Sequence, residues 1–222
     1  MKNMFQMAVF DMDGVLVDID SSWRFLHESF HVDSSSNIRS YLSGKIDYKE
    51  FMRNDIRLWG PKHIDQVTEI LDKVQLMTGA PQAIRTLRLS GCKTAILSAG
   101  ISILARRVQG ELKMDYAFAN ELDVGDNGML TGEGVEVVNL LDKVSAFKKL
   151  AAIARIQVQD SAVIGDSVFD VPLFKHAGLS IAFNSTDDRV RRAATVVIGE
   201  KDLTKILPHI MVERVQVHRT VC

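Results

Sequence analysis

The sequence QMAVFDMDG, residues 6–14 of this 222-residue chain, decides the predicted fold class. Residues 6–10 are a short apolar run, which is typical of a buried strand in a parallel sheet. Asp11, Asp13 and Gly14 end the run abruptly, so two carboxylates follow directly from a strand. In open α/β sheets, ligands bind beyond the carboxyl ends of strands. The pair is therefore a candidate functional site, although a polar turn alone gives the same pattern.

Beyond residue 77 the sequence alternates between strand and helix patterns. Strands are predicted at residues 93–97, 116–119, 161–164, 179–183 and 195–198, and helices at 81–90, 102–110, 142–154, 166–176 and 188–193. Asp126-Asn127-Gly128 is a hairpin-turn signal between arms at 122–124 and 129–131. The alternation predicts a doubly wound, Rossmann-like α/β fold with a parallel sheet.

Residues 20–77 have a different pattern, in which Trp23, Leu26 and Phe30 recur at helical offsets and no strand pattern is found. Three or four short helices are predicted there, inserted after the first strand of the sheet. We therefore expect an α/β core at residues 1–16 and 78–207, an inserted helical domain at 17–77 and a C-terminal tail at 208–222. The tail is a candidate contact for a homodimer.

Composition excludes several classes of protein. Hydrophobic residues make up 46% of the chain and charged residues 25%, so a disordered chain is not expected. With 27 Lys and Arg against 28 Asp and Glu, we expect no nucleic-acid or membrane partner, and an anionic small substrate would need a metal or a few placed donors. The longest uncharged run, residues 94–105, is shorter than the ~20 residues of a spanning helix. No export signal is found, so we expect a cytoplasmic protein.

A second acidic motif, Gly165-Asp166-x-x-x-Asp170, follows another predicted strand. By itself it is more typical of a helix cap formed by Asp166. Together with Asp11 and Asp13, however, it places four carboxylates at two strand ends. Such an oxygen-rich pocket suits Mg²⁺, which binds a few carboxylates and keeps waters and phosphate oxygens.

Two further polar residues lie at predicted element boundaries. Ser98 ends the strand at residues 93–97, where a hydroxyl and the N–H groups of a helix N-terminus can bind an anion. A plain helix N-cap gives the same pattern. Lys143 begins the helix at residues 142–154, where a surface lysine is the ordinary interpretation.

The order of these features is more specific than any one of them. A strand-end Asp pair, the strand-end Ser98, the helix-start Lys143 and the Gly-Asp-x-x-x-Asp motif follow one another, with a helical insertion after the first. This order resembles the haloacid dehalogenase (HAD) superfamily of phosphohydrolases over residues 6–207, and the insertion resembles that family's cap domain. Residues 115–120, 130–132 and 177–183 resemble its phosphoserine phosphatase branch.

The resemblance implies a Mg²⁺-dependent phosphomonoester hydrolase that acts on a small phosphorylated metabolite, with phosphoserine among the candidates. Asp11 would be the nucleophile that forms an aspartyl-phosphate, and Asp13 would be the general acid and then the base. Ser98 and Lys143 would bind phosphate oxygens, and Gly100 would let the backbone approach the substrate. The implied phosphate-binding stretch is Ser98, Ala99, Gly100 and Lys143, and the implied metal-site residues are Asp11, Asp13, Asp166 and Asp170.

In the cap, the resemblance assigns substrate contacts to Asp20 and Tyr48, at the positions of an amino-group ligand and an aromatic contact. The arginine expected to bind a substrate carboxylate is replaced by Asp55. Arg53 and Arg57 flank that position and are the candidates to supply the charge. A substrate carboxylate buried without a cation would be costly.

Three other functions share part of this residue set. A phosphotransferase that passes the phosphoryl group to an alcohol carries every motif, and only the cap decides between water and an acceptor. A receiver-like signalling module also uses an aspartate, a lysine and metal ligands, but its aspartate lies on a later strand and it has no helical insertion. A dehalogenase would not need Asp13.

Overall fold

The computed structural model describes residues 5–211, in which a seven-stranded sheet forms the centre. The strands are β1 (Met7–Phe10), β2 (Lys93–Ile101), β3 (Tyr116–Val124), β4 (Leu130–Val135), β5 (Ser161–Gly165), β6 (Leu179–Phe183) and β7 (Val196–Ile198). Their order is β4-β3-β2-β1-β5-β6-β7, and only the β3–β4 pair is antiparallel. The chain builds outward from β1 to β4 and then returns to β5 on the other side. The prediction of a doubly wound parallel sheet is confirmed.

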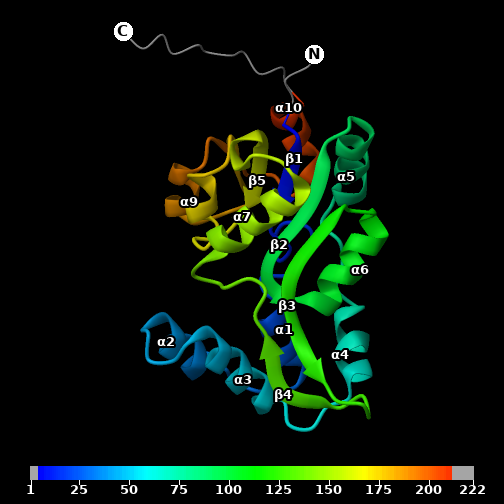
Figure 1. Cartoon of the computed structure of the whole chain (residues 1–222), viewed down its shortest axis with the longest axis vertical. Helices are drawn as coiled ribbons and strands as arrows, with labels where there is room; N and C mark the ends of the chain where they lie inside the picture. The colour runs from blue at the N-terminus through cyan, green and yellow to red at the C-terminus, as the bar shows by residue number, and fades with distance from the viewer. Residues whose placement is uncertain (1–4, 212–222) are drawn as a thin grey trace.

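Helices cover both faces of this sheet (Figure 1). One face carries α5 (Ala80–Leu89), α6 (Ser102–Leu112), the short turn η2 (Leu203–Ile206) and α10 (Leu207–Ile210), and the other carries α7 (Lys143–Ala154), η1 (Val158–Asp160), α8 (Val171–Phe174) and α9 (Asp188–Ala193). Every residue of β1 is buried, because Ala8 and Phe10 pack toward the first layer while Met7 and Val9 pack toward the second. This two-sided burial explains why the strand is a continuous apolar run instead of an alternating one.

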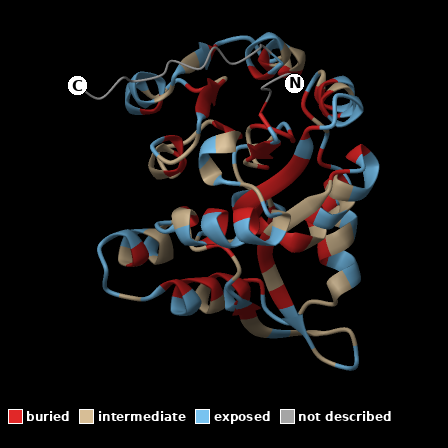
Figure 2. Cartoon of the chain, turned by 45° about the horizontal axis from the view of Figure 1, so that its top comes forward, coloured by how far each residue is buried: buried red, intermediate tan, exposed pale blue. Residues whose placement is uncertain are grey.

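Four helices lie between β1 and α5 in the chain, in agreement with the prediction of three or four. They are α1 (Ser22–Ser29), α2 (Ser35–Leu42), α3 (Tyr48–Leu58) and α4 (Ile64–Leu71), and they lie at the same end of the molecule as the β3–β4 hairpin, against which α3 packs (Figure 1). Their interior is aromatic, since Trp23 stacks on Trp59 with ring centroids 5.8 Å apart and Tyr41 stacks on Phe51 at 5.2 Å. Buried residues run without interruption from these helices into the sheet (Figure 2).

Two predicted elements differ from the structure. The strand predicted to end at Leu97 continues to Ile101, through a register shift against β3. The helix predicted at residues 166–176 shortens to α8, because the Asp170 carboxylate accepts hydrogen bonds from the Ser167 backbone N–H (3.1 Å) and hydroxyl (3.0 Å). Residues 166–170 therefore form a turn that precedes the helix.

The predicted tail begins inside α10, and the side chain of Ile210 is fully buried against the sheet layer. The remaining tail residues, 212–222, lie outside the described part of the chain, as does the dimer contact predicted for them. Within residues 5–211, no helix has both the length and the apolar character needed to cross a membrane.

Candidate active site

The strand-end carboxylates of β1 and β5 lie side by side because these two strands are neighbours in register, with Phe10 opposite Ile164. The loop that carries Asp11 and Asp13 turns at Gly14, where φ is +75°. A Cβ at Gly14 would lie 2.2 Å from the Asp166 Oδ2 atom. Glycine is therefore required both for the left-handed backbone and for the close approach of the two acidic loops.

Lys143 is the cation at the centre of this group. It is the first residue of α7, whose N-cap Asp142 accepts a hydrogen bond from the Ser145 N–H. The ammonium lies 2.5 Å from Asp11 Oδ2 and 2.7 Å from Asp170 Oδ1, and the residue is 2% exposed. Burial opposes the charge, but the two carboxylates outweigh it and raise the pKa of Lys143 above its ordinary value. The surface-lysine interpretation does not hold for this side chain.

Asp13 occupies a different environment from Asp11. Its Oδ2 atom accepts hydrogen bonds from the Ser22 backbone N–H at 2.7 Å and from the Ser22 hydroxyl at 2.8 Å. Its Oδ1 atom is buried and has no hydrogen-bond partner among the described residues. Burial raises the pKa of Asp13 to about 7. A carboxyl group that titrates near neutrality can both give and take a proton.

Three of the predicted metal-site residues form an acidic cluster. Asp11, Asp166 and Asp170 each offer a carboxylate oxygen within 4.8 Å of the others. Burial raises the pKa of Asp166 to about 8, and the charges of Asp11 and Asp170 add to that rise. Burial also raises the pKa of Asp11, against the opposing effect of Lys143 and a hydrogen bond from Ser98. An all-oxygen set whose charges repel one another fits a hard divalent cation such as Mg²⁺.

The stretch Ser98, Ala99 and Gly100 lies beside these carboxylates, but not as a helix cap. The strand runs on to Ile101, which is the N-cap of α6 and makes no side-chain capping bond. The Ser98 hydroxyl instead accepts a hydrogen bond from the Gly100 N–H at 3.1 Å. A Cβ at Gly100 would lie 3.0 Å from Asp13 Oδ2. Ser98 therefore lies within β2 and not at a helix N-terminus, which corrects that part of the expectation, while its binding of a phosphate oxygen stays a prediction.

The physical reason for the longer strand is the carbonyl of Ala99. It accepts hydrogen bonds from Trp23 Nε1 at 3.0 Å, Asn120 Nδ2 at 2.9 Å and the Tyr48 hydroxyl at 3.3 Å. Asn120 is fully buried in β3, and its Oδ1 also accepts from the Val138 N–H. Its role was not predicted, because Asn120 lies one residue beyond the strand expected at residues 116–119, whereas β3 runs on to Val124.

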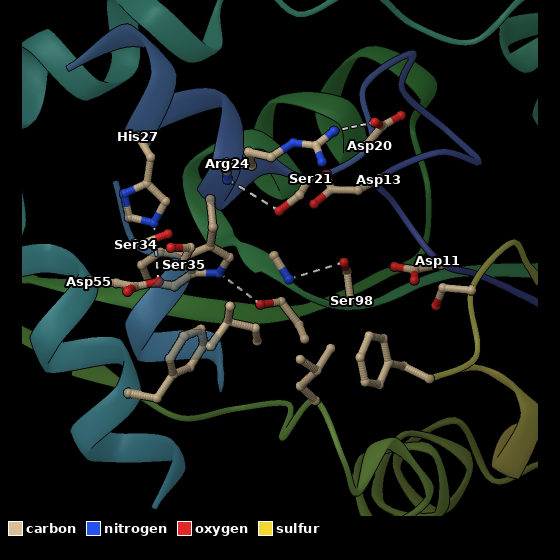
Figure 3. A pocket seen from close by; sticks show the side chains of 18 of the residues that line it. Asp11, Asp13, Asp20, Ser21, Arg24, His27, Ser34, Ser35, Asp55 and Ser98 are labelled. Carbon is tan, nitrogen blue, oxygen red and sulfur yellow. Dashed lines mark hydrogen bonds and ion pairs between the residues drawn. The ribbon is translucent and has the colours of Figure 1, made fainter. Parts of the chain in front are cut away.

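A cavity of about 670 Å³ joins these groups to the inserted helices. Figure 3 shows Asp11 and Ser98 at one end and His27 and Asp55 at the other. Of the predicted cap residues, Asp20 and Tyr48 line this cavity. Asp20 is paired with Arg24 at its rim, and burial raises the pKa of the Tyr48 hydroxyl.

Arg53 and Arg57 do not line the cavity, which corrects the expectation that they supply a charge to the substrate. Both bind Glu133 of β4, with Arg53 Nε at 2.8 Å and an Arg57 terminal nitrogen at 2.9 Å from its Oε1. The reason is helix phase: residues two positions from Asp55 lie roughly 200° around the axis of α3, so they face away when Asp55 faces inward.

A buried polar network at the cap end was missed by the sequence analysis. Trp59 Nε1 lies 2.9 Å from His27 Nδ1, and His27 Nε2 lies 3.1 Å from Asp55 Oδ2. Asp55 Oδ1 accepts a hydrogen bond from Asn37 Nδ2 at 2.8 Å. No sequence spacing links these four residues, which come from α1, α2, α3 and the residue that follows α3.

Comparison with known proteins places this geometry in a family. A model of haloacid dehalogenase-like hydrolases matches residues 5–178. The phosphoserine phosphatase of Methanocaldococcus jannaschii is 31% identical over 208 residues, which is 92% of this chain and 97% of the relative, and that of Lactococcus lactis is 29% identical over 90% and 93%. A solved structure described as a phospho-aspartyl intermediate analogue of phosphoserine phosphatase matches with a TM-score of 0.79, at 29% identity over 93% of this chain and 99% of that one.

These findings define a phosphatase built on an α/β core. The chain belongs to the haloacid dehalogenase-like hydrolases, and phosphoserine phosphatases are among its curated relatives.

Proposed function

We propose that this chain is a Mg²⁺-dependent phosphomonoester hydrolase that acts on a small phosphorylated metabolite through an aspartyl-phosphate formed on Asp11. One observation carries the proposal. Asp11 and Asp13 stand in one loop of one cavity, next to a buried lysine and an acidic cluster, yet their environments differ. One carboxylate is held against an ammonium, and the other keeps a buried oxygen without a partner.

Asp11 is the group placed to attack phosphorus. Lys143 and the Met12 N–H (2.7 Å) hold one carboxylate oxygen each, so the side chain is oriented before substrate arrives. An oxygen of Asp11 bonds to phosphorus as the bond from phosphorus to the leaving oxygen breaks, which transfers the phosphoryl group to the enzyme. Lys143 offsets the negative charge that both reactants bring together.

Asp13 moves the proton in both steps. In the first step its acid form gives a proton to the leaving oxygen of the alcohol. In the second step the resulting carboxylate takes a proton from the water that attacks the aspartyl-phosphate, which releases phosphate and restores Asp11. A pKa of about 7 suits a group that must be acid and then base at neutral pH. Ser22 fixes the side chain through Oδ2 and leaves Oδ1 for this exchange.

The carboxylates of Asp11 and Asp166 and the backbone carbonyl of Asp13 would hold Mg²⁺, with Asp170 beside them anchoring Lys143. When bound, the ion would neutralise charge on the phosphate oxygens. The Ser98 hydroxyl would donate to a remaining phosphate oxygen, while its own oxygen accepts from the Gly100 N–H. The chain's own part is to orient these donors and to keep the site largely buried.

We further propose that residues 17–77 act as a cap over an α/β core made of residues 1–16 and 78–207. The cavity supports this division, because its walls come from both parts. Trp23 and Tyr48 of the cap donate to the Ala99 carbonyl of the core, which ties the two parts together beside the phosphate-binding stretch. Of the predicted tail, Ile210 packs into the core, so we place the end of the core at the end of α10.

Phosphoserine is the substrate that the relatives suggest, because phosphoserine phosphatases are among them. Asp20, the predicted ligand of a substrate amine, lines the cavity but is paired with Arg24. A cytoplasmic location and a homodimer stay predictions.

The test is phosphate release from a panel of phosphorylated metabolites and from p-nitrophenyl phosphate, with and without Mg²⁺. We expect release that requires Mg²⁺ and is lost in the Asp11→Asn variant. Acid quenching during turnover should trap labelled phosphate on the protein as an acyl phosphate. Metal-independent release, or full turnover in Asp11→Asn, would overturn the proposal.

A further inference from the structure

Asp55 gives the cap end of the cavity a buried negative charge, and we infer that it selects a phosphomonoester carrying an ammonium group and no carboxylate. This inference rests on the proposed function and names its substrate class. Asp55 is 1% exposed and lines the same cavity as Asp11 and Ser98 (Figure 3). On this inference, the cap end of the cavity is the place that receives the organic part of a substrate whose phosphate lies at Asp11.

The partners of Asp55 are neutral. Indole Nε1 is only a donor, so the contact from Trp59 requires that His27 Nδ1 accepts and carries no proton. His27 Nε2 must then carry the ring proton and donate it to Asp55 Oδ2. The remaining partner, Asn37, donates from its amide. Both oxygens of Asp55 accept from N–H donors, as an ionised carboxylate does, and no cation offsets the charge in this network.

The other charged residues of the cavity wall make the cap end more negative. Within the described residues, the cap end of the wall holds the carboxylates of Asp20, Glu28, Asp33 and Asp55 against the single cation Arg24. The Arg24 guanidinium is already engaged by two carboxylates, because it pairs with Asp20 and its Nε lies 3.5 Å from Glu28 Oε1. Its side chain is also 59% exposed, so solvent screens it far more than it screens Asp55.

A substrate carboxylate placed against Asp55 would meet like charge in a poorly hydrated site, which is the arrangement that proteins avoid. An ammonium in the same place would gain a charge-assisted hydrogen bond. The matched compounds are therefore O-phosphoethanolamine, which has the amine alone, and phosphoserine, which adds a carboxylate to it. Hydroxyethyl phosphate replaces the amine with a neutral hydroxyl and tests whether the positive charge is what is recognised.

The experiment compares kcat/KM for these three compounds and for p-nitrophenyl phosphate, at saturating Mg²⁺, in the wild type and in Asp55→Asn. The wild type should prefer phosphoethanolamine to both of the other small phosphates by roughly tenfold or more, which is the range of one charge-assisted hydrogen bond. Asp55→Asn keeps the shape of the side chain and removes its charge. It should lower the ratio of phosphoethanolamine to p-nitrophenyl phosphate by roughly 10- to 100-fold.

Glu50→Gln is the matched control, because Glu50 is an exposed carboxylate on the same helix that does not line the cavity. It should leave the ratio at the wild-type value. The wild-type comparison keeps the inference testable even if Asp55→Asn does not fold, as judged by circular dichroism.

The outcomes separate the two proposals. Preference for phosphoserine over phosphoethanolamine would overturn this inference, leave the phosphatase proposal intact and point to Arg24 as the carboxylate's partner. Equal rates on phosphoethanolamine and hydroxyethyl phosphate, or an equal ratio change in Glu50→Gln, would also overturn it. A wild type that hydrolyses none of the compounds, p-nitrophenyl phosphate included, would overturn the proposed function and the inference with it.

Discussion

The two ends of the cavity both bury carboxylates, but they balance them in different ways. At the core end, Lys143 bridges Asp11 and Asp170 through contacts of 2.5 and 2.7 Å. At the cap end, Asp55 is held by the neutral donors of His27 and Asn37. The carboxylates at the core end are thus stabilised by a cation, and Asp55 at the cap end is stabilised by neutral hydrogen-bond donors.

This difference indicates what each end is for. A phosphate dianion can approach the core end only if its charge and that of the nucleophile are offset, and a buried lysine beside an acidic cluster provides that together with a metal. The cap end keeps its negative charge uncompensated, at a cost that hydrogen bonds reduce but do not remove. On the proposals made above, the core stabilises the charges of the reaction and the cap discriminates between substrates.

The largest expected effect is the loss of turnover when the proposed nucleophile at the core end is removed. Asp11→Asn keeps the side chain's shape and one hydrogen-bond acceptor but removes the nucleophile, so kcat should fall roughly a thousandfold or more on every substrate. Steady-state phosphate release measures it, and circular dichroism confirms the fold. Asp18→Asn is the control, since Asp18 is an exposed carboxylate paired with Lys201 outside the cavity. Appreciable turnover in Asp11→Asn would remove Asp11 from the role of nucleophile.

The next effect separates Asp13 from Asp11. Asp13→Asn should slow enzyme phosphorylation by an alkyl phosphate by roughly 10²- to 10⁴-fold, because the alkoxide leaving group then gains no proton. p-Nitrophenyl phosphate should lose far less in this step, since nitrophenolate leaves without a proton. Rapid-quench measurement of the first turnover isolates the step from hydrolysis of the intermediate. Equal losses on both substrates would contradict the general-acid role.

The wild-type pH dependence follows from the same group. Asp13 has a pKa of about 7, so its acid form declines as pH rises above that value. The first-turnover rate with an alkyl phosphate should therefore fall above about pH 7, whereas the rate with p-nitrophenyl phosphate should stay level there. The same fall with both substrates would assign the titration to another group.

A smaller effect concerns stability without metal. Burial raises the pKa of Asp166 from 3.8 to about 8 and that of Asp13 from 3.8 to about 7. Between about pH 4 and pH 8, the native state therefore holds more protons than the unfolded chain. The free energy of unfolding should therefore decrease as pH rises through that window. At pH 8.5 in EDTA, Asp166→Asn should melt roughly 2–8 °C above the wild type, which corresponds to about 1–2 kcal/mol.

Adding Mg²⁺ provides the control for that measurement. A cation bound by the native carboxylates stabilises the fold by mass action, so the wild type should gain more thermal stability from Mg²⁺ than Asp166→Asn does. At pH 5 the two proteins should melt closer together than at pH 8.5, because the carboxyls are then protonated in the native state. A melting temperature of the wild type that does not change when Mg²⁺ is added would argue against a metal site at Asp166.

The core end was largely predictable from the sequence, and the cap end was not. Asp11 and Asp166 follow neighbouring strands, and the parallel topology alone brings the ends of such strands together. Strand ends, turn glycines and helix starts are local signals, so residues far apart in the chain could be placed from them. Ser98 was assigned to the right place but to the wrong element, because the bond pattern on the Ala99 carbonyl depends on side chains from three distant segments.

No comparable rule fixes how four short helices pack. The face of α3 that meets the cavity depends on its rotation about its own axis, and a half-turn exchanges Asp55 for its arginine neighbours. The sequence offers cations at Arg53 and Arg57 and an anion at Asp55, but not the choice between them. Glu133, which attracts both arginines away from the cavity, is 80 residues from Arg53 in the chain and belongs to the core hairpin.

The smallest effect tests that choice of helix face. Arg53→Ala removes a partly exposed ion pair with Glu133, so it should cost about 0–1 kcal/mol of stability and leave substrate preference at the wild-type ratio. Thermal melting and the kcat/KM series used for Asp55 measure both quantities, and Glu133→Gln should give the same small loss because it breaks the same pair. A selective loss of phosphoserine turnover in Arg53→Ala, without the same loss in Glu133→Gln, would mean that Arg53 leaves Glu133 to bind the substrate carboxylate, and that α3 presents its other face during catalysis.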